Sequence, residues 1–177
     1  KGYGHNDERG IYPIPRNNIH GQELMSAAAG GIVCHIDGML KWLKALLNNA
    51  KTPSGESIFS HEALENMWRS HTVLNVSSTA RSPHKTHFRD YGIGWRKENI
   101  YGYEMLSHTG NLSGYQAYVA LLPELDLGVV ILNNGSNYGV RSSIMQSIIK
   151  SLMPEAPVID WVKYWASSRG LGPSGIG

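Results

Sequence analysis

The sequence predicts an α+β fold, in which helices flank an antiparallel β-sheet. Apolar residues recur at helical spacing over residues 36–47 and again over residues 140–153. Between these segments, from residue 91 to residue 132, the pattern changes to the short apolar runs that are typical of strands. Because helices and strands are segregated along the chain rather than alternating, we expect an antiparallel sheet and not a doubly wound parallel one.

Four segments are expected along the chain. Residues 1–30 are rich in Gly, Pro and Asn and are interpreted as loop and extended backbone, with a short strand near Tyr3. Residues 31–90 should form part of a helical subdomain with a long loop, and residues 91–155 the sheet and the C-terminal helix. Residues 156–177 should form a short helix followed by a loose tail.

Helix boundaries follow from capping residues and prolines. The first helix has Asp37 in its first turn, where a carboxylate suits the positive end of the helix dipole. A second helix begins after Ser60 as its N-cap and runs to about Arg69, and Pro154 ends the third. The apolar positions at helical spacing are Leu64, Met67 and Trp68 in the second helix, and Val140, Ile144, Ile148 and Leu152 in the third.

Strands are predicted from apolar runs with aromatic and β-branched members, at residues 91–96, 101–107, 116–122 and 127–132. Pro123 presets a tight turn between the last two strands, which therefore form an antiparallel hairpin. The polar stretch over residues 70–90 predicts a long loop.

Composition excludes several classes of function. The formal net charge of +2 is too small to imply a nucleic-acid partner, and no apolar stretch approaches the roughly 20 residues that span a bilayer. The single cysteine, Cys34, excludes an internal disulfide, and its apolar neighbours favour a buried, inert thiol. His84 and His87 lie three residues apart in a loop, without the pattern His-Glu-x-x-His, so neither a metal nor another cofactor is expected.

The segment His108-Thr109-Gly110 carries the strongest chemical signal. A strand ends in these residues, and the chain re-enters a strand after further polar and glycine residues. Histidine can donate or accept protons near neutral pH, the Thr hydroxyl does both, and glycine lets a ligand approach the backbone closely. These properties suit a strand edge that holds an extended substrate by strand addition.

The stretch around this segment resembles the class C β-lactamase family, which also holds DD-peptidases, penicillin-binding proteins and related esterases. It contains Tyr-Gly-Ile-Gly-Trp from Tyr91, Ser-His-Thr-Gly-Asn-Leu-Ser-Gly-Tyr from Ser107, and Leu-Leu-Pro-Glu-Leu-Asp-Leu-Gly-Val-Val-Ile-Leu-Asn-Asn up to Asn134. The order and spacing of these motifs carry the resemblance, which covers roughly residues 10–155. It implies a partial β-lactamase/transpeptidase-like fold.

In that family the third active-site motif is Lys or His, then Thr or Ser, then Gly, on a strand that lines the site. The resemblance implies that His108 and Thr109, followed by Gly110, move protons or hold a substrate carboxylate. It also implies that the backbone N–H of Asn111 forms half of the oxyanion hole, where a donor can supply on the order of 3 kcal/mol.

Three further residues are candidates for substrate binding. Tyr115, beside the motif, would line the cleft. Asn137 and Arg141 could reach a substrate carboxylate, since the Arg guanidinium offers a bidentate fork. The alternative for these two residues is a helix-start Asn and a surface Arg.

The family's other two motifs are Ser-x-x-Lys, which gives the nucleophile and its base, and Tyr-x-Asn. No Tyr-x-Asn occurs in the sequence. Ser82 and Lys85 match Ser-x-x-Lys in a polar loop, and Ser147 and Lys150 match it within the last helix, where Lys150 is expected to face solvent. Neither match is followed by the rest of the family pattern, and residues 85–87, Lys-Thr-His, lack the glycine of the third motif. The nucleophile is therefore expected outside this chain.

The sequence thus predicts the C-terminal portion of a serine hydrolase acting on D-Ala-D-Ala peptides, β-lactams or small esters, and inactive by itself. A neutral His108 favours peptidase or esterase activity over efficient β-lactamase activity. Two alternatives stay open: a non-catalytic relative that binds cell-wall peptides or a protein, and a structural domain in which the motif is coincidental. An exposed sheet should pair with the protein's own N-terminal half or with another copy. The resemblance also implies a bacterial, periplasmic or otherwise extracytoplasmic location.

Overall fold

A computed structural model describes residues 1–15, 27–112 and 114–168 of the chain. The strands are β1 (Gly2–Asn6), β2 (Gly10–Ile14), β3 (Thr72–Leu74), β4 (Arg89–Tyr91), β5 (Arg96–Ile100), β6 (Tyr103–Leu112), β7 (Tyr115–Leu122) and β8 (Leu127–Asn133). The helices are α1 (Ala27–Gly30), α2 (Ile36–Leu47), α3 (His61–Trp68), α4 (Ser78–His84), α5 (Tyr138–Ser151) and α6 (Trp161–Ser168), with the 3₁₀ helix η2 (Pro123–Leu125).

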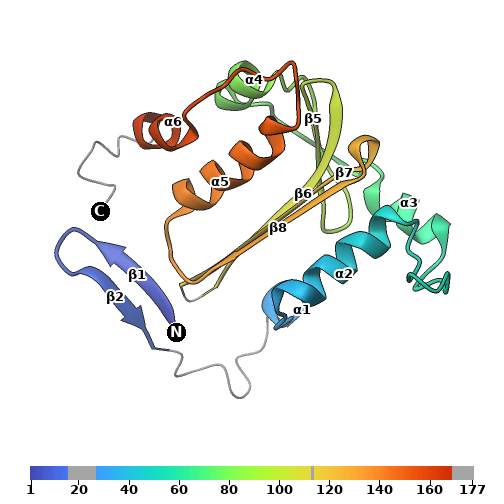
Figure 1. Cartoon of the computed structure of the whole chain (residues 1–177), viewed down its shortest axis with the longest axis horizontal. Helices are drawn as coiled ribbons and strands as arrows, with labels where there is room; N and C mark the ends of the chain where they lie inside the picture. The colour runs from blue at the N-terminus through green and yellow to red at the C-terminus, as the bar shows by residue number, and fades with distance from the viewer. Residues whose placement is uncertain (16–26, 113, 169–177) are drawn as a thin grey trace. The chain divides into compact units, whose positions relative to one another are not determined.

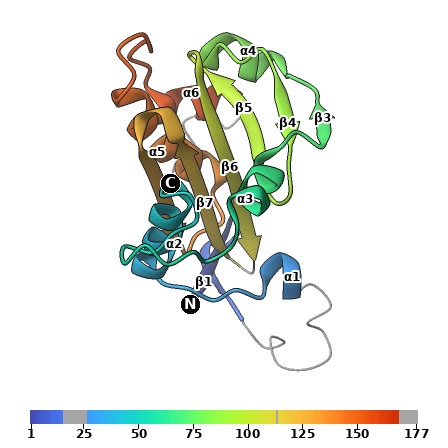
Figure 2. The same cartoon turned by 90° about the vertical axis from the view of Figure 1, so that its right-hand side faces the viewer.

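The strands form antiparallel sheets, which confirms the predicted α+β class. Strands β3 to β8 follow one another in chain order across a six-stranded sheet, and Figure 2 shows β3 to β7 side by side. The register between β4 and β5 runs from Arg89↔Glu98 to Tyr91↔Arg96, and that between β5 and β6 from Arg96↔Ser107 to Ile100↔Tyr103. As predicted, η2 forms the short turn between β7 and β8.

The described chain falls into two compact units, one formed by residues 1–34, 109–118 and 131–177, the other by residues 35–108 and 119–130. We call them unit 1 and unit 2 and describe each by itself. These units interleave along the chain, whereas the sequence suggested four consecutive segments.

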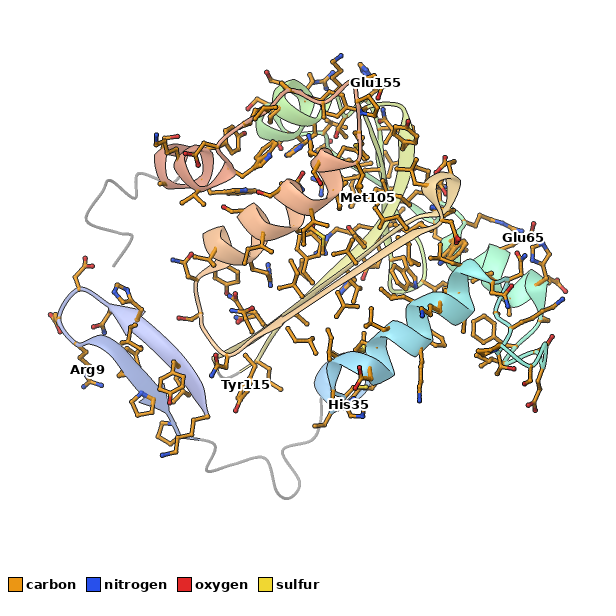
Figure 3. All side chains as sticks on the ribbon, viewed as in Figure 1. Arg9, His35, Glu65, Met105, Tyr115 and Glu155 are labelled. Carbon is orange, nitrogen blue, oxygen red and sulfur yellow. The ribbon has the colours of Figure 1, made fainter. Side chains whose placement is uncertain are left out.

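Unit 2 is built around helix α2, which has the predicted bounds. The His35 side chain accepts a hydrogen bond from the Gly38 backbone N–H at 3.4 Å and so caps the helix, at whose N-terminal end Figure 3 shows it. Helix α3 is capped as predicted by Ser60. A buried apolar cluster in unit 2 contains Leu43, Leu46, Ala50, Leu64, Trp95, Leu106 and Leu121.

The long loop predicted over residues 70–90 is wrong, because this stretch contains β3, α4 and β4. These elements are three to seven residues long and none of their described side chains is fully buried, so they leave no apolar periodicity in the sequence. The strand predicted over residues 91–96 is also wrong. The chain turns after Tyr91, where the Gly92 N–H donates to the Trp95 carbonyl at 2.8 Å and Gly94 has a φ of +76°.

Unit 1 begins with an antiparallel hairpin of β1 and β2, shown in blue in Figure 1, which includes the strand expected near Tyr3. The Tyr3 N–H donates to the Asn134 carbonyl at 2.9 Å and to that of Gly114 at 3.4 Å. Gly114 has a φ of +77°, and a Cβ there would lie 2.6 Å from the Tyr3 nitrogen, so this close approach requires glycine. The predictions for residues 16–26 and 169–177 lie outside the described residues.

Helix α5 spans Tyr138–Ser151, two residues earlier than the predicted 140–153, and exposes the apolar residues on which that prediction rested. Its apolar positions at spacing four are exposed, namely Val140, Ile144, Ile148 and Leu152. The buried residues of α5 are the apolar Met145 and Ile149 together with four polar residues, namely Arg141, Ser143, Gln146 and Lys150. The expectation that Lys150 faces solvent is wrong, since its Nζ lies 4.9 Å from the centroid of the Trp161 ring in α6. The Ser143 hydroxyl likewise donates to the Trp161 carbonyl at 2.9 Å.

The exposure of Cys34 differs from the prediction. Cys34 is exposed, so the expectation of a buried thiol is wrong; the apolar residues before it, Ile32 and Val33, are exposed as well. Among the described residues, no helix is long and apolar enough to cross a membrane.

Candidate active site

Strand β6 ends in the residues that the sequence singled out. Its pairing with β5 ends at Arg96 and Ser107, whereas β6 itself continues through His108 to Leu112. His108 and Thr109 are half-buried, while Gly110 and Asn111 are exposed. An extended backbone that continues past the end of its neighbour is suited to bind an extended ligand through main-chain hydrogen bonds.

In unit 2, the imidazole of His108 is held by a tyrosine. The hydroxyl of Tyr91, the last residue of β4, lies 2.9 Å from His108 Nε2, within hydrogen-bonding distance. The two rings also meet edge to face, with their centroids 6.0 Å apart and an interplanar angle of 66°. Tyr91 was not predicted as a site residue; the sequence signalled it only by its place at the start of Tyr-Gly-Ile-Gly-Trp.

In unit 1, Arg141 of α5 binds the backbone of the motif. Its Nη1 donates to the Gly110 carbonyl at 3.0 Å and to the Ala117 carbonyl of β7 at 3.3 Å. The guanidinium carbon lies 5.6 Å from the centroid of the Tyr118 ring and 5.4 Å from that of Tyr138. The Arg141 residue is only 6% exposed, so the alternative of a surface arginine is wrong.

Of the remaining candidates, Asn111 and Asn137 lie near the start of α5. The Asn111 side-chain amide donates to the Tyr138 hydroxyl at 2.7 Å. The Asn137 side-chain oxygen accepts hydrogen bonds from the N–H groups of Gly139 and Val140 at 2.9 and 3.2 Å, which makes it the N-cap of α5. Tyr115 lies half-buried at the beginning of β7, as Figure 3 shows.

The structure thus brings Gly110 together with Arg141, and gives Asn111 a partner, Tyr138, that the sequence did not predict. The first turn of α5 supplies both contacts. Tyr118 and Tyr138 were likewise not predicted, because their contact with a guanidinium depends on which face of α5 is buried.

The two Ser-x-x-Lys matches are poorly placed for nucleophilic catalysis. Ser82 lies in α4 rather than in the expected loop and is exposed, while the Nζ of Lys85 lies 5.2 Å from the centroid of the Tyr101 ring. Ser147 is exposed, whereas Lys150 is buried with its Nζ 4.9 Å from the centroid of the Trp161 ring. A serine is activated by a base within hydrogen-bonding reach, and neither arrangement shows such a pair.

Comparison with known proteins gives three findings. The model of the family described as Beta-lactamase matches residues 2–146. Unguisins hydrolase ungD' of Aspergillus campestris is 26% identical over 171 residues, which are 93% of this chain and 29% of that protein. Unguisins hydrolase ungD of Aspergillus violaceofuscus is 29% identical over 147 residues, which are 77% of this chain and 26% of that protein.

A solved structure shares the fold. The octameric penicillin-binding protein homologue from Pyrococcus abyssi has a TM-score of 0.63 and 24% sequence identity, over 84% of this chain and 30% of that chain. The chain therefore spans less than a third of the length of the curated relatives and the solved structure that it matches.

Proposed function

We propose that this chain, which belongs to the beta-lactamase family, supplies one side of the active site of a serine hydrolase. Both Aspergillus relatives named above are hydrolases. The observation that carries the proposal is the motif His108-Thr109-Gly110 at the end of β6, inside the matched region. The reaction is acyl transfer: a serine attacks a carbonyl, an acyl-enzyme forms, and water releases it.

In this proposal, His108 and Thr109 assist proton transfer or hold a substrate carboxylate. The Tyr91 hydroxyl at 2.9 Å supports this role, because a hydrogen bond to Nε2 fixes the orientation of the ring. The Asn111 N–H is one donor to the oxyanion that develops on the attacked carbonyl. Such a donor is effective because it is oriented before the reaction begins.

The nucleophile and its base come from a part of the protein outside these 177 residues. The contexts of Ser82 and Ser147 support this proposal, as does the chain's share of its relatives' length. Substrates are peptides of the D-Ala-D-Ala type, β-lactams or small esters, with Tyr115 lining the cleft. The relatives named above come from fungi and from Pyrococcus abyssi, and a bacterial, extracytoplasmic location stays a prediction.

Covalent labelling tests the proposal on the full-length protein, meaning the longest natural polypeptide that contains these residues. A fluorophosphonate or a fluorescent penicillin should label one serine, located by mass spectrometry outside this chain. His108→Ala should slow labelling by about 10²–10⁴-fold, the usual contribution of a general acid or base. The matched control is His87→Ala, an exposed loop histidine, which should label at the normal rate.

Two other labelling outcomes would contradict the proposed function or the proposed position of the nucleophile. If the folded full-length protein takes up neither probe, it is not a serine hydrolase; the alternative, a non-catalytic binder of cell-wall peptides, then remains and is tested by titration with a D-Ala-D-Ala peptide. Labelling at Ser82 or Ser147 would place the nucleophile in this chain.

We further propose that the exposed apolar positions of α5 are covered by another segment of the same longer polypeptide. Ile144 and Ile148, at the centre of this stripe, are 45% and 39% exposed. Apolar side chains repeated at spacing four form a continuous stripe along a helix, and such stripes mark contact surfaces. A second copy is the competing occupant, since the Pyrococcus abyssi homologue is octameric.

A further inference from the structure

We propose that Arg141 is a positioning residue for the oxyanion hole: it fixes the peptide unit between Gly110 and Asn111 by binding that unit's carbonyl. The proposal rests on the proposed function, in which the Asn111 N–H is an oxyanion donor. It assigns to Arg141 a role different from the substrate-carboxylate contact that the sequence suggested.

Within unit 1, Arg141 contacts two backbone carbonyls and two aromatic rings. One nitrogen, Nη1, bridges the carbonyls of Gly110 and Ala117, which lie on the adjacent strands β6 and β7. The Tyr118 and Tyr138 rings lie within cation–π distance of the guanidinium. A planar cation with these contacts has little freedom to rotate toward a ligand.

The geometry of the peptide bond relates this contact to catalysis. The carbonyl of Gly110 and the N–H of Asn111 belong to one peptide unit, and the described backbone contains no cis peptide bond. In a planar trans unit the C=O and the N–H point in opposite directions. The N–H of Asn111 therefore points away from Arg141, and a substrate oxygen that it binds lies on the opposite side of the strand from the guanidinium.

A buried cation affects such a unit in two ways. It fixes the plane of the peptide, and hence the direction of the N–H. It also draws electron density toward the Gly110 oxygen, which makes the Asn111 N–H a stronger donor, as hydrogen bonds in a chain polarise one another. Arg141 is 6% exposed, so the guanidinium side of this contact is shielded from water, which strengthens the hydrogen bond, while Gly110 and Asn111 present the other side of the peptide unit to solvent.

A second contact from the same helix turn restrains the next residue. The Tyr138 hydroxyl accepts a hydrogen bond from the Asn111 side chain at 2.7 Å. Tyr138 and Arg141 lie three positions apart on α5, so both project from one side of the helix. The first turn of α5 thus holds the peptide unit through its carbonyl and through the following side chain.

Steady-state kinetics of the full-length protein distinguish a positioning role from a substrate contact. The substrates are p-nitrophenyl butyrate, which has no carboxylate, and a penicillin, which has one. Arg141→Met should lower kcat by about 10- to 100-fold for both substrates, somewhat less than the loss of an oxyanion donor, with little change in KM. Arg141→Lys keeps the charge without the planar fork and should recover part of kcat.

Arg9→Met is the matched control, because Arg9 is exposed and lies over Tyr12 in the β1–β2 hairpin. It removes the same charge and should leave both kinetic constants unchanged. A rise in KM for the penicillin alone, with normal turnover of the ester, would overturn the proposal and make Arg141 a substrate ligand.

Nuclear magnetic resonance tests the contact without requiring turnover. In ¹⁵N-labelled full-length protein, Arg141→Met should shift the Asn111 amide resonance, because loss of a hydrogen bond to the Gly110 carbonyl alters the nitrogen of the same peptide. Arg9→Met should leave that resonance in place. An unshifted Asn111 amide in folded Arg141→Met protein would refute the contact; if that variant does not fold, Arg141→Lys provides the same readout.

The two proposals can therefore fail separately. Absence of covalent labelling in the wild-type protein would refute the serine-hydrolase function and leave the resonance test of Arg141 intact. Normal labelling with unchanged kcat in Arg141→Met would refute the positioning role alone.

Discussion

Tyr91 and Arg141 each hold one residue of the motif on β6 from a distant point in the sequence. Tyr91 lies 17 positions from His108, and Arg141 lies 31 positions from Gly110. The sequence identified the motif itself, because its residue types and spacing are local. It could not identify these partners, because a hydrogen bond between distant residues depends on strand order and on which helix face is buried. Asn137 could be predicted from its local sequence. The sequence offered a helix-start Asn as the alternative to a substrate contact, and its capping hydrogen bonds agree with that alternative.

At the residue scale, Tyr91→Phe removes the hydroxyl from His108 while keeping the aromatic ring. A hydrogen bond of this kind contributes about 0.5–1.5 kcal/mol, so kcat/KM should fall by about 3- to 10-fold. The ¹⁵N resonances of the His108 ring should show a changed balance of tautomers. Tyr103→Phe, elsewhere on β6, is the control. Unchanged ring resonances in Tyr91→Phe would mean that Tyr91 does not orient His108.

At the scale of elements, helix α5 shows which features the spacing of apolar residues can predict and which it cannot. Apolar spacing correctly predicted a helix, because spacing reflects the helical repeat itself. It did not predict the buried face, where Met145 and Ile149 are joined by polar residues. Three of these polar residues have specific partners: Ser143 and Lys150 contact Trp161, and Arg141 contacts backbone carbonyls. Polar residues can be buried where such partners exist. These partners lie at distant positions and cannot be identified from the sequence alone.

The first turn of α5 should be sensitive to its cap. Asn137→Ala removes the oxygen that accepts hydrogen bonds from Gly139 and Val140, and should lower the free energy of unfolding by about 1 kcal/mol. Chemical denaturation monitored by circular dichroism measures this. Asn137→Asp, which keeps the cap, should be nearly as stable as the wild type. If Asn137→Asp is stable but KM rises for the penicillin alone, Asn137 also binds substrate.

At the scale of the whole molecule, the sequence predicted the antiparallel sheet and its main strands, since β6, β7 and β8 are apolar and long enough to show their pattern. It did not predict the interleaving of two units. That arrangement follows from contacts between segments more than a hundred residues apart, such as the Tyr3 N–H and the Asn134 carbonyl.

Thiol labelling tests what covers α5 in the full-length protein. In a Cys34→Ser background, Ile148→Cys should react with a maleimide more slowly than Glu155→Cys, an exposed position in unit 1, by a factor on the order of 10 or more, because a covered site reacts only through local opening. This should hold at concentrations where light scattering shows a monomer. Equal rates would contradict coverage, and protection only in oligomers would identify a second copy as the occupant.

The contact between Arg141 and the carbonyls of Gly110 and Ala117 has a consequence for how this site can change during evolution. Every residue has a backbone carbonyl, so the contact does not depend on the side chain at position 117. The Ala117 side chain can therefore be replaced to suit new substrates without breaking this contact, whereas Tyr118 on the same strand packs its ring against the guanidinium and is constrained. Under the proposed role of Arg141, substrate range can then vary at position 117 with little effect on the oxyanion donor.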